Sequence, residues 1–246
     1  MCQIADMTVV TPDTLIVSNI TNKCVQLMDS RNGRVLSQVQ LQDRPGRMCL
    51  TDRTTAAVTK GDKIQMIQIK DRSLTIGNKL TVRGNVYGIT FSKNSLVVSY
   101  GKPPWLQVIS MDGKVLQQLD QPGSSQHFMF PWFMCTTPDG SVLISDTNTN
   151  KITKVDASLN ILQTFTSPLL QDPRGIISVT KDQILVCSNR NHRLLLLQPS
   201  TNTVTTLLEE DDGIYNPHSL AYCPGQKRLY IAPSYLTDTI KVYKIM

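Results

Sequence analysis

Short runs in which apolar and polar residues alternate fill the chain. Between residues 131 and 165 four such runs follow one another, at 132–136, 141–145, 151–156 and 161–165. The third run, Lys151 to Asp156, alternates strictly, which is typical of a strand with one solvent-facing side. Turn-forming residues separate the runs, with Pro138-Asp139-Gly140 as the clearest case. The segment therefore predicts four short antiparallel strands.

The four-strand pattern recurs along the whole chain. Equivalent strand-opening positions fall at intervals of 40 to 45 residues, at Asp6, Gly46, Tyr87, Trp132, Arg174 and His218. Units of about forty residues with four strands each are typical of the blades of a β-propeller. We therefore predict an all-β fold, a six-bladed β-propeller that forms one domain over residues 1–246. Its blades are expected at approximately 1–41, 42–82, 83–121, 122–167, 168–211 and 212–246.

The sixth unit is shorter than the others. It has residues for only three strands before Met246, and only Met1 to Ile4 precede the first strand of unit one. We therefore expect a three-stranded sixth blade with an exposed outer edge, in a chain that is part of a longer protein.

Two segments carry a resemblance to a known family. The residues SDTNTNKI at 145–152 and SNRNHRL at 188–194 resemble the D-x-x-N-x-[RK]-I core of NHL repeats. Pro173-Arg174-Gly175-Ile176 resembles the P-x-G-I start of the same repeat. The chain is most similar in character to the C-terminal NHL domains of tripartite-motif proteins, in which the propeller binds protein or RNA. The resemblance implies the substrate- or RNA-recognition part of a ubiquitin ligase, without the RING domain that ligase activity needs.

One face of the predicted disc collects arginine and aromatic residues. The loops between blades and the loops between second and third strands share this face, which we call the first face. Candidate ligand-binding residues there are Arg47, Lys60, Tyr87, Tyr100, Trp105, Trp132, Arg174, Arg190 and His218. Aromatic rings interleaved with arginine are typical of surfaces that bind protein or unstacked bases. The alternative is that such rings plug the channel mouth or pack between blades.

Five of these residues recur at nearly equal spacing. We expect Arg47, Tyr87, Trp132, Arg174 and His218 to ring the mouth of the central channel with side chains at least partly exposed.

The net charge of +6 favours an anionic partner without deciding between RNA and protein, and we lean slightly to protein. A metal-dependent propeller hydrolase or lyase is the alternative, because His127, His192 and His218 fall on or near the first face. A zinc site needs about three converging ligands, and no G-x-S-x-G or H-E-x-x-H motif occurs. We therefore expect a non-catalytic binding module without a cofactor.

Other features bear on location and assembly. No apolar run approaches the roughly twenty residues that span a bilayer, and the six cysteines form no C-x-x-C pair. We expect a cytoplasmic protein without membrane contact or disulfides. Any oligomerisation is expected to use regions outside this chain.

Overall fold

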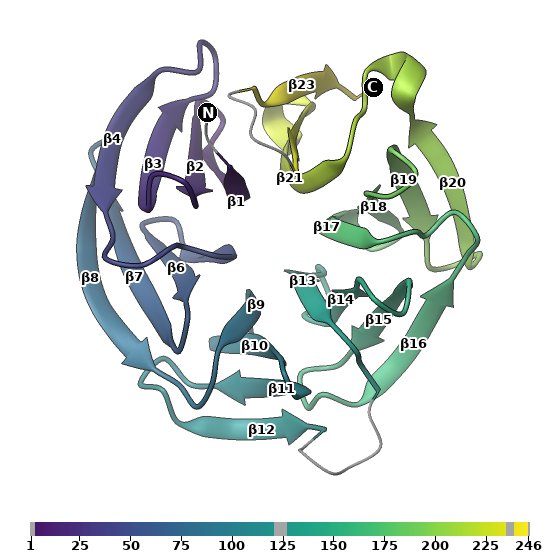
Figure 1. The fold of residues 1–246 in the computed structure, drawn as a ribbon, viewed down its shortest axis with the longest axis horizontal. Helices are drawn as coiled ribbons and strands as arrows, with labels where there is room; N and C mark the ends of the chain where they lie inside the picture. The colour runs from purple at the N-terminus through teal and green to yellow at the C-terminus, as the bar shows by residue number, and fades with distance from the viewer. Residues whose placement is uncertain (1–2, 121–126, 235–238, 246) are drawn as a thin grey trace.

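Six antiparallel sheets form a ring around a central axis, in a computed structural model that describes residues 3–120, 127–234 and 239–245 (Figure 1). The predicted six-bladed β-propeller is confirmed. Within each sheet the strands pair in sequence order, each with the next along the chain.

The first three blades occupy the N-terminal half of the ring. Blade 1 comprises β1 (Ile4–Thr11), β2 (Thr14–Asn19), β3 (Cys24–Asp29) and β4 (Val35–Gln40). Blade 2 comprises β5 (Met48–Asp52), β6 (Thr55–Lys60), β7 (Lys63–Lys70) and β8 (Ser73–Thr81). Blade 3 comprises β9 (Val86–Ser92), β10 (Ser95–Gly101), β11 (Pro104–Ile109) and β12 (Val115–Leu119).

The remaining blades complete the ring. Blade 4 comprises β13 (Pro131–Thr136), β14 (Val142–Asp146), β15 (Lys151–Val155) and β16 (Ile161–Thr166). Blade 5 comprises β17 (Pro173–Thr180), β18 (Gln183–Ser188), β19 (Arg193–Gln198) and β20 (Thr203–Leu208). Blade 6 comprises β21 (Pro217–Cys223), β22 (Arg228–Pro233) and β23 (Lys241–Lys244). In the described part of the chain the sixth sheet thus has three strands, as predicted.

The first strand of each blade lies nearest the axis, and neighbouring first strands contact one another around the ring. The ring closes where β1 contacts β21, so the first and last blades meet without sharing a sheet (Figure 1).

The hydrophobic core lies between blades. Ile16 and Val25 of blade 1 pack in one cluster with Ala56 and Ile67 of blade 2. Every residue of β2 and β6 is buried, because both faces of these strands are covered by neighbouring blades. Each blade therefore depends on its neighbours for burial, as expected of a repeat architecture.

A recurring serine joins consecutive blades at the end of the second strand. The hydroxyls of Ser18, Ser99 and Ser145 are buried and donate to carbonyl oxygens of the next blade. Their acceptors are Gly46 O at 2.8 Å, Pro131 O at 2.7 Å and Arg174 O at 2.8 Å. Blade 2 has Thr59 at this position, and its buried hydroxyl oxygen has no hydrogen-bond partner among the described residues.

The serine contact gives a stability prediction. Ser99 also accepts a hydrogen bond from the Gly88 N–H at 2.8 Å, so Ser99→Ala leaves buried polar groups unpaired. We expect a loss of about 1–3 kcal/mol in the free energy of unfolding, measured with urea. Thr59→Val is the matched control, and we expect no loss because its hydroxyl has no partner to forfeit. Equal losses in both variants would contradict the role assigned to the serine.

Candidate functional site

The first face carries the beginnings of all six inner strands. Arg47 immediately precedes β5, and Tyr87, Trp132, Arg174 and His218 are the second residues of β9, β13, β17 and β21. Because equivalent strands start at the same end of the ring, these residues all lie at the first-face end of the central channel.

Arg47 reaches across the axis. Its Cζ lies 3.6 Å from the ring centroid of Phe133 and 4.6 Å from that of Trp132, both in blade 4. Its Nη2 lies 3.1 Å from Nε2 of His218 in blade 6. Blades 2, 4 and 6 alternate around the ring, so a side chain from one can touch the other two only near the axis. Arg47 and His218, each 3% exposed, therefore close this end of the channel.

Arg174 completes this closed cluster from blade 5. Its guanidinium donates to the Asp172 carboxylate at 2.8 Å and to the Ser234 hydroxyl at 2.9 Å. Its Nη1 also lies 2.9 Å from Nδ1 of His218, and its Cζ lies 5.2 Å from the Trp132 ring centroid.

His218 therefore has an arginine at each ring nitrogen. Guanidinium groups only donate, and a neutral imidazole accepts at one nitrogen, so only one of these contacts can be a normal hydrogen bond. Burial, together with the charges of Arg47 and Arg174, lowers the pKa of His218 well below its usual value. The imidazole is therefore neutral at pH 7.

Arg47 keeps unused hydrogen-bonding capacity. Its Nε and Nη1 are buried without a partner among the described residues. Burial lowers the pKa of Arg47 to about 9, an effect that the Asp6 charge opposes and the Arg174 charge reinforces. The closed end of the channel thus holds positive charge that its surroundings only partly neutralise.

A row of aromatic rings lies beside this cluster. Tyr87 and Phe130 pack edge to face with centroids 5.0 Å apart, and Phe130 and Trp132 do so at 5.2 Å. All three rings are half-buried. The backbone N–H groups of Met129 and Phe130 donate to the Asp146 carboxylate, which fixes the loop that carries Phe130.

The expected ring of partly exposed residues is confirmed only in part. Tyr87, Trp132 and Arg174 are half-buried as expected, but the prediction of exposure is wrong for Arg47 and His218. The reason is that both side chains turn inward to the axis. Their position in the repeat specifies the end of the strand and not the direction of the side chain.

Three further candidates lie in strands instead of surface loops. Lys60, Tyr100 and Trp105 are buried, which corrects their predicted placement, because β6, β10 and β11 extend to the edge of the first face. Lys60 pairs with Asp43 at 3.2 Å. Tyr100 and Trp105 contact each other at the boundary of blades 2 and 3, with ring centroids 4.8 Å apart. Arg190 is exposed.

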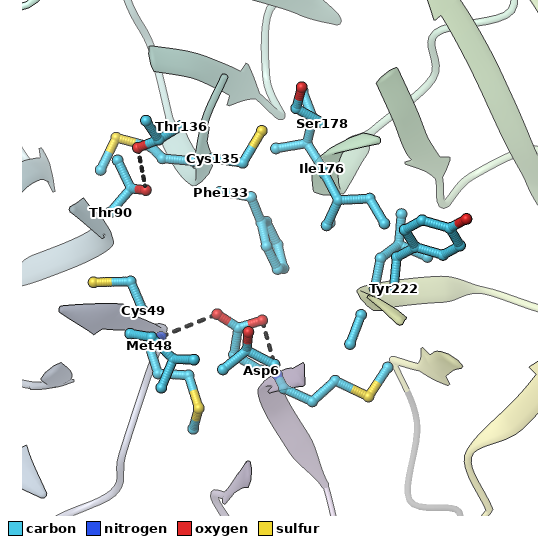
Figure 2. A pocket seen from close by; sticks show the side chains of 18 of the residues that line it. Asp6, Met48, Cys49, Thr90, Phe133, Cys135, Thr136, Ile176, Ser178 and Tyr222 are labelled. Carbon is cyan, nitrogen blue, oxygen red and sulfur yellow. Dashed lines mark hydrogen bonds between the residues drawn. The ribbon is translucent and has the colours of Figure 1, made fainter. Parts of the chain in front are cut away.

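A cavity of about 360 Å³ occupies the channel beyond the closed end, lined by later residues of the inner strands (Figure 2). Asp6 and Phe133 face its interior. The Asp6 carboxylate accepts from the Met48 N–H at 3.0 Å and from the Ser219 hydroxyl at 2.7 Å. Asp6 therefore connects blades 1, 2 and 6 at the point where the ring closes, a role that the sequence pattern did not suggest.

The three histidines have separate surroundings. Nδ1 of His127 lies 2.6 Å from the Asp120 carboxylate, and Nε2 of His192 lies 3.4 Å from that of Glu210. Within residues 3–120, 127–234 and 239–245, no group of three or more His, Cys, Asp or Glu side chains is placed to hold a metal ion. The same residues contain no helix long and apolar enough to cross a bilayer.

Comparisons with known proteins support the fold and no finer assignment. No protein-family model matches the chain, and no curated protein matches it either. Among solved structures, a streptogramin B lyase is similar with a TM-score of 0.71 and 13% identity, covering 99% of this chain and 83% of that chain.

Two further structures are similar to the same degree. Virginiamycin B lyase from Staphylococcus aureus gives 0.70 and 17% identity, covering 99% of this chain and 84% of that chain. The Cps50 (Swd1) β-propeller domain of Myceliophteria thermophila gives 0.70 and 13%, with the same coverages. At these identities the likeness shows the fold alone, and the resemblance to NHL domains of tripartite-motif proteins stays a prediction.

The neutral, buried His218 predicts a pH dependence of stability. Below about pH 6.5 the unfolded chain binds a proton at this residue that the folded chain does not. The unfolded state then holds more protons, so the free energy of unfolding should fall with falling pH, by about 1.4 kcal/mol per pH unit from this group. His218→Gln should show a shallower fall in urea titrations between about pH 7 and pH 5. Identical slopes would contradict a neutral His218.

The channel thiols should react slowly. Burial raises the pKa of Cys135 to about 12, and burial together with the Asp6 charge raises that of Cys49 above its usual range. Cys49, Cys135, Cys187 and Cys223 form no disulfide, as predicted, whereas Cys2 lies outside the described residues. We expect iodoacetamide at about pH 8 to label Cys49 and Cys135 at least about tenfold more slowly in the native than in the unfolded protein. Peptide mapping would reveal equal rates if the channel were open.

Proposed function

We propose that this propeller is a non-catalytic recognition module that binds RNA across its first face. One observation carries the proposal: several acidic side chains of that face are paired with lysine or arginine, whereas several of its exposed cations have no ion-pair partner among the described residues.

The pairing can be followed residue by residue. Asp211 and Asp212 of this face are exposed and have no ion-pair partner among the described residues. Four other acids are paired with lysine or arginine: Asp43 with Lys60, Asp62 with Lys63, Asp172 with Arg174 and Glu209 with Arg193. In contrast, Arg44, Arg83, Lys102 and Arg190 are exposed and have no ion-pair partner among the described residues. Their uncompensated charge, added to that of buried Arg47, favours an anionic polymer at this face.

The aromatic row favours single-stranded over paired RNA. Tyr87, Phe130 and Trp132 present half-buried rings beside Arg174. Unstacked bases bind to such rings, and each stacked base contributes about 1–3 kcal/mol.

A protein partner with an acidic segment is the second candidate. Met129 and Tyr215 on the same face are 57% and 56% exposed, which suits an apolar contact in the centre of a protein interface. Either ligand fits the expectation, implied by the resemblance, that the module serves substrate or RNA recognition in a cytoplasmic, tripartite-motif type ubiquitin ligase. The lyase alternative has only the fold in its favour.

Charge reversal on the first face tests the proposal. Arg44→Glu with Arg190→Glu should weaken binding of a mixed-sequence single-stranded RNA and make its salt dependence shallower. Each lost phosphate contact removes about 0.7 from the slope of log K against log salt. The assay is filter binding between about 50 mM and 200 mM salt.

Arg53→Glu is the matched control, because Arg53 is exposed on the opposite face without an ion-pair partner among the described residues. Arg174→Glu is a poorer probe, since it also breaks the contacts to Asp172 and Ser234. If the protein with Arg44→Glu and Arg190→Glu binds the RNA as tightly as the Arg53→Glu variant does, the proposal is overturned. Salt-insensitive binding to a protein would favour the second candidate.

A further inference from the structure

A cavity of about 580 Å³ opens beside blade 3, away from the central channel. Its wall includes the connector before β9, with Arg83 and Asn85, and the β10–β11 pair, with Tyr100, Lys102 and Trp105. The volume lies within the range of small-molecule sites, about 300–1,000 Å³.

Blade 3 departs from the repeat at this point. At the corresponding cross-strand pair, blade 1 has Asn19 opposite Cys24, blade 2 has Lys60 opposite Lys63, and blade 4 has Asp146 opposite Lys151. Blade 3 has Tyr100 opposite Trp105. In blades 1 and 4 the polar residue holds a turn, since Asn19 accepts the Asn22 N–H and Asp146 accepts those of Asn148 and Thr149. An aromatic pair gives up that local role, and such departures are typical of functional positions.

The floor of the cavity is held by a chain of hydrogen bonds. The Tyr100 hydroxyl donates to Oε1 of Gln107 at 2.8 Å, and Nε2 of Gln107 donates to Oε1 of Gln118 at 3.1 Å. Gln107 is buried, and Trp105 is 9% exposed beside it. These contacts fix the aromatic pair before any ligand arrives, which lowers the entropy cost of binding.

The rim is positively charged. Arg83 and Lys102 are exposed and have no ion-pair partner among the described residues, and none of the described residues that line the cavity is an aspartate or glutamate. Asn85 adds an exposed amide at the same rim. Two cations, an amide and a fixed indole are the groups that recognise a phosphate, the edge of a base and its flat face.

We propose that this cavity binds one nucleotide, with the base against Trp105 and Asn85 and the phosphate between Arg83 and Lys102. If the nucleotide is a residue of bound RNA, this inference rests on the proposed function. A free nucleoside phosphate offers the same groups.

Intrinsic fluorescence tests the site directly, because the chain has two tryptophans. In a Trp132→Phe background Trp105 is the single reporter, and UMP or AMP should quench it saturably. Arg83→Gln and Lys102→Gln in that background should each raise the dissociation constant about tenfold, in line with loss of a charge-assisted hydrogen bond. Arg53→Gln is the control and should leave it unchanged.

Isothermal titration calorimetry of the otherwise unchanged protein and its Arg83→Gln variant provides the same comparison if the Trp132→Phe background folds poorly. Ribose 5-phosphate is the second probe. If it binds as tightly as UMP and AMP, the assignment of a base to Trp105 is overturned.

A single-stranded oligonucleotide separates the two sources of the nucleotide. If UMP or AMP binds and the Arg83→Gln, Lys102→Gln double variant also weakens RNA binding, the cavity takes a residue of the RNA. Weaker RNA binding without any mononucleotide binding reflects only the lost charge of the first face and overturns the inference. If mononucleotides bind but this double variant holds RNA as tightly as before, the cavity serves a free nucleotide. If neither mononucleotide binds and RNA affinity is unchanged in the double variant, the inference is overturned while the proposed function stands. If UMP binds and RNA does not, the proposed function fails alone.

Discussion

The buried guanidinium of Arg47 at the axis is the constraint on which the first face depends. A buried charge is tolerated only where the surroundings replace water. Here the faces of Phe133 and Trp132 and the charge of Asp6 supply that replacement. Because these partners come from blades 1 and 4, the position of one side chain couples blades that share no sheet.

Asp6, one of the groups that surround Arg47, also takes part in closing the ring. Blades 1 and 6 share no strand, so contacts between β1 and β21 and the hydrogen bonds of Asp6 hold them together. A carboxylate suits this place because it accepts from Met48 and Ser219 at once and partly neutralises Arg47. A neutral side chain in place of Asp6 would remove the hydrogen bonds that join blades 1, 2 and 6, and would also remove the negative charge near Arg47.

The sequence predicted the blades because each blade must repeat the same turns and alternation. It could not predict the direction of side chains at the channel mouth, where side chains from six blades converge and only some of them can reach the axis. Arg47 fills the centre and leaves Trp132 and Arg174 at the margin. This outcome depends on the sizes of side chains from several blades, and the sequence of a single repeat does not contain that information. The departure of Tyr100 and Trp105 from the repeat, in contrast, is visible in the sequence once the units are aligned by their cross-strand pairs.

The closed axis also limits where a ligand can bind at the first face. A partner there cannot thread the channel without displacing Arg47 and His218, whose burial ties them to three blades. Recognition at this face is therefore expected at the margin, where Arg44, Arg83, Lys102 and Arg190 remain exposed. The axial charge still contributes, since a buried cation is screened less by salt than an exposed one. The aromatic pair of blade 3 lies at this margin, away from the channel, beside the exposed Arg83 and Lys102.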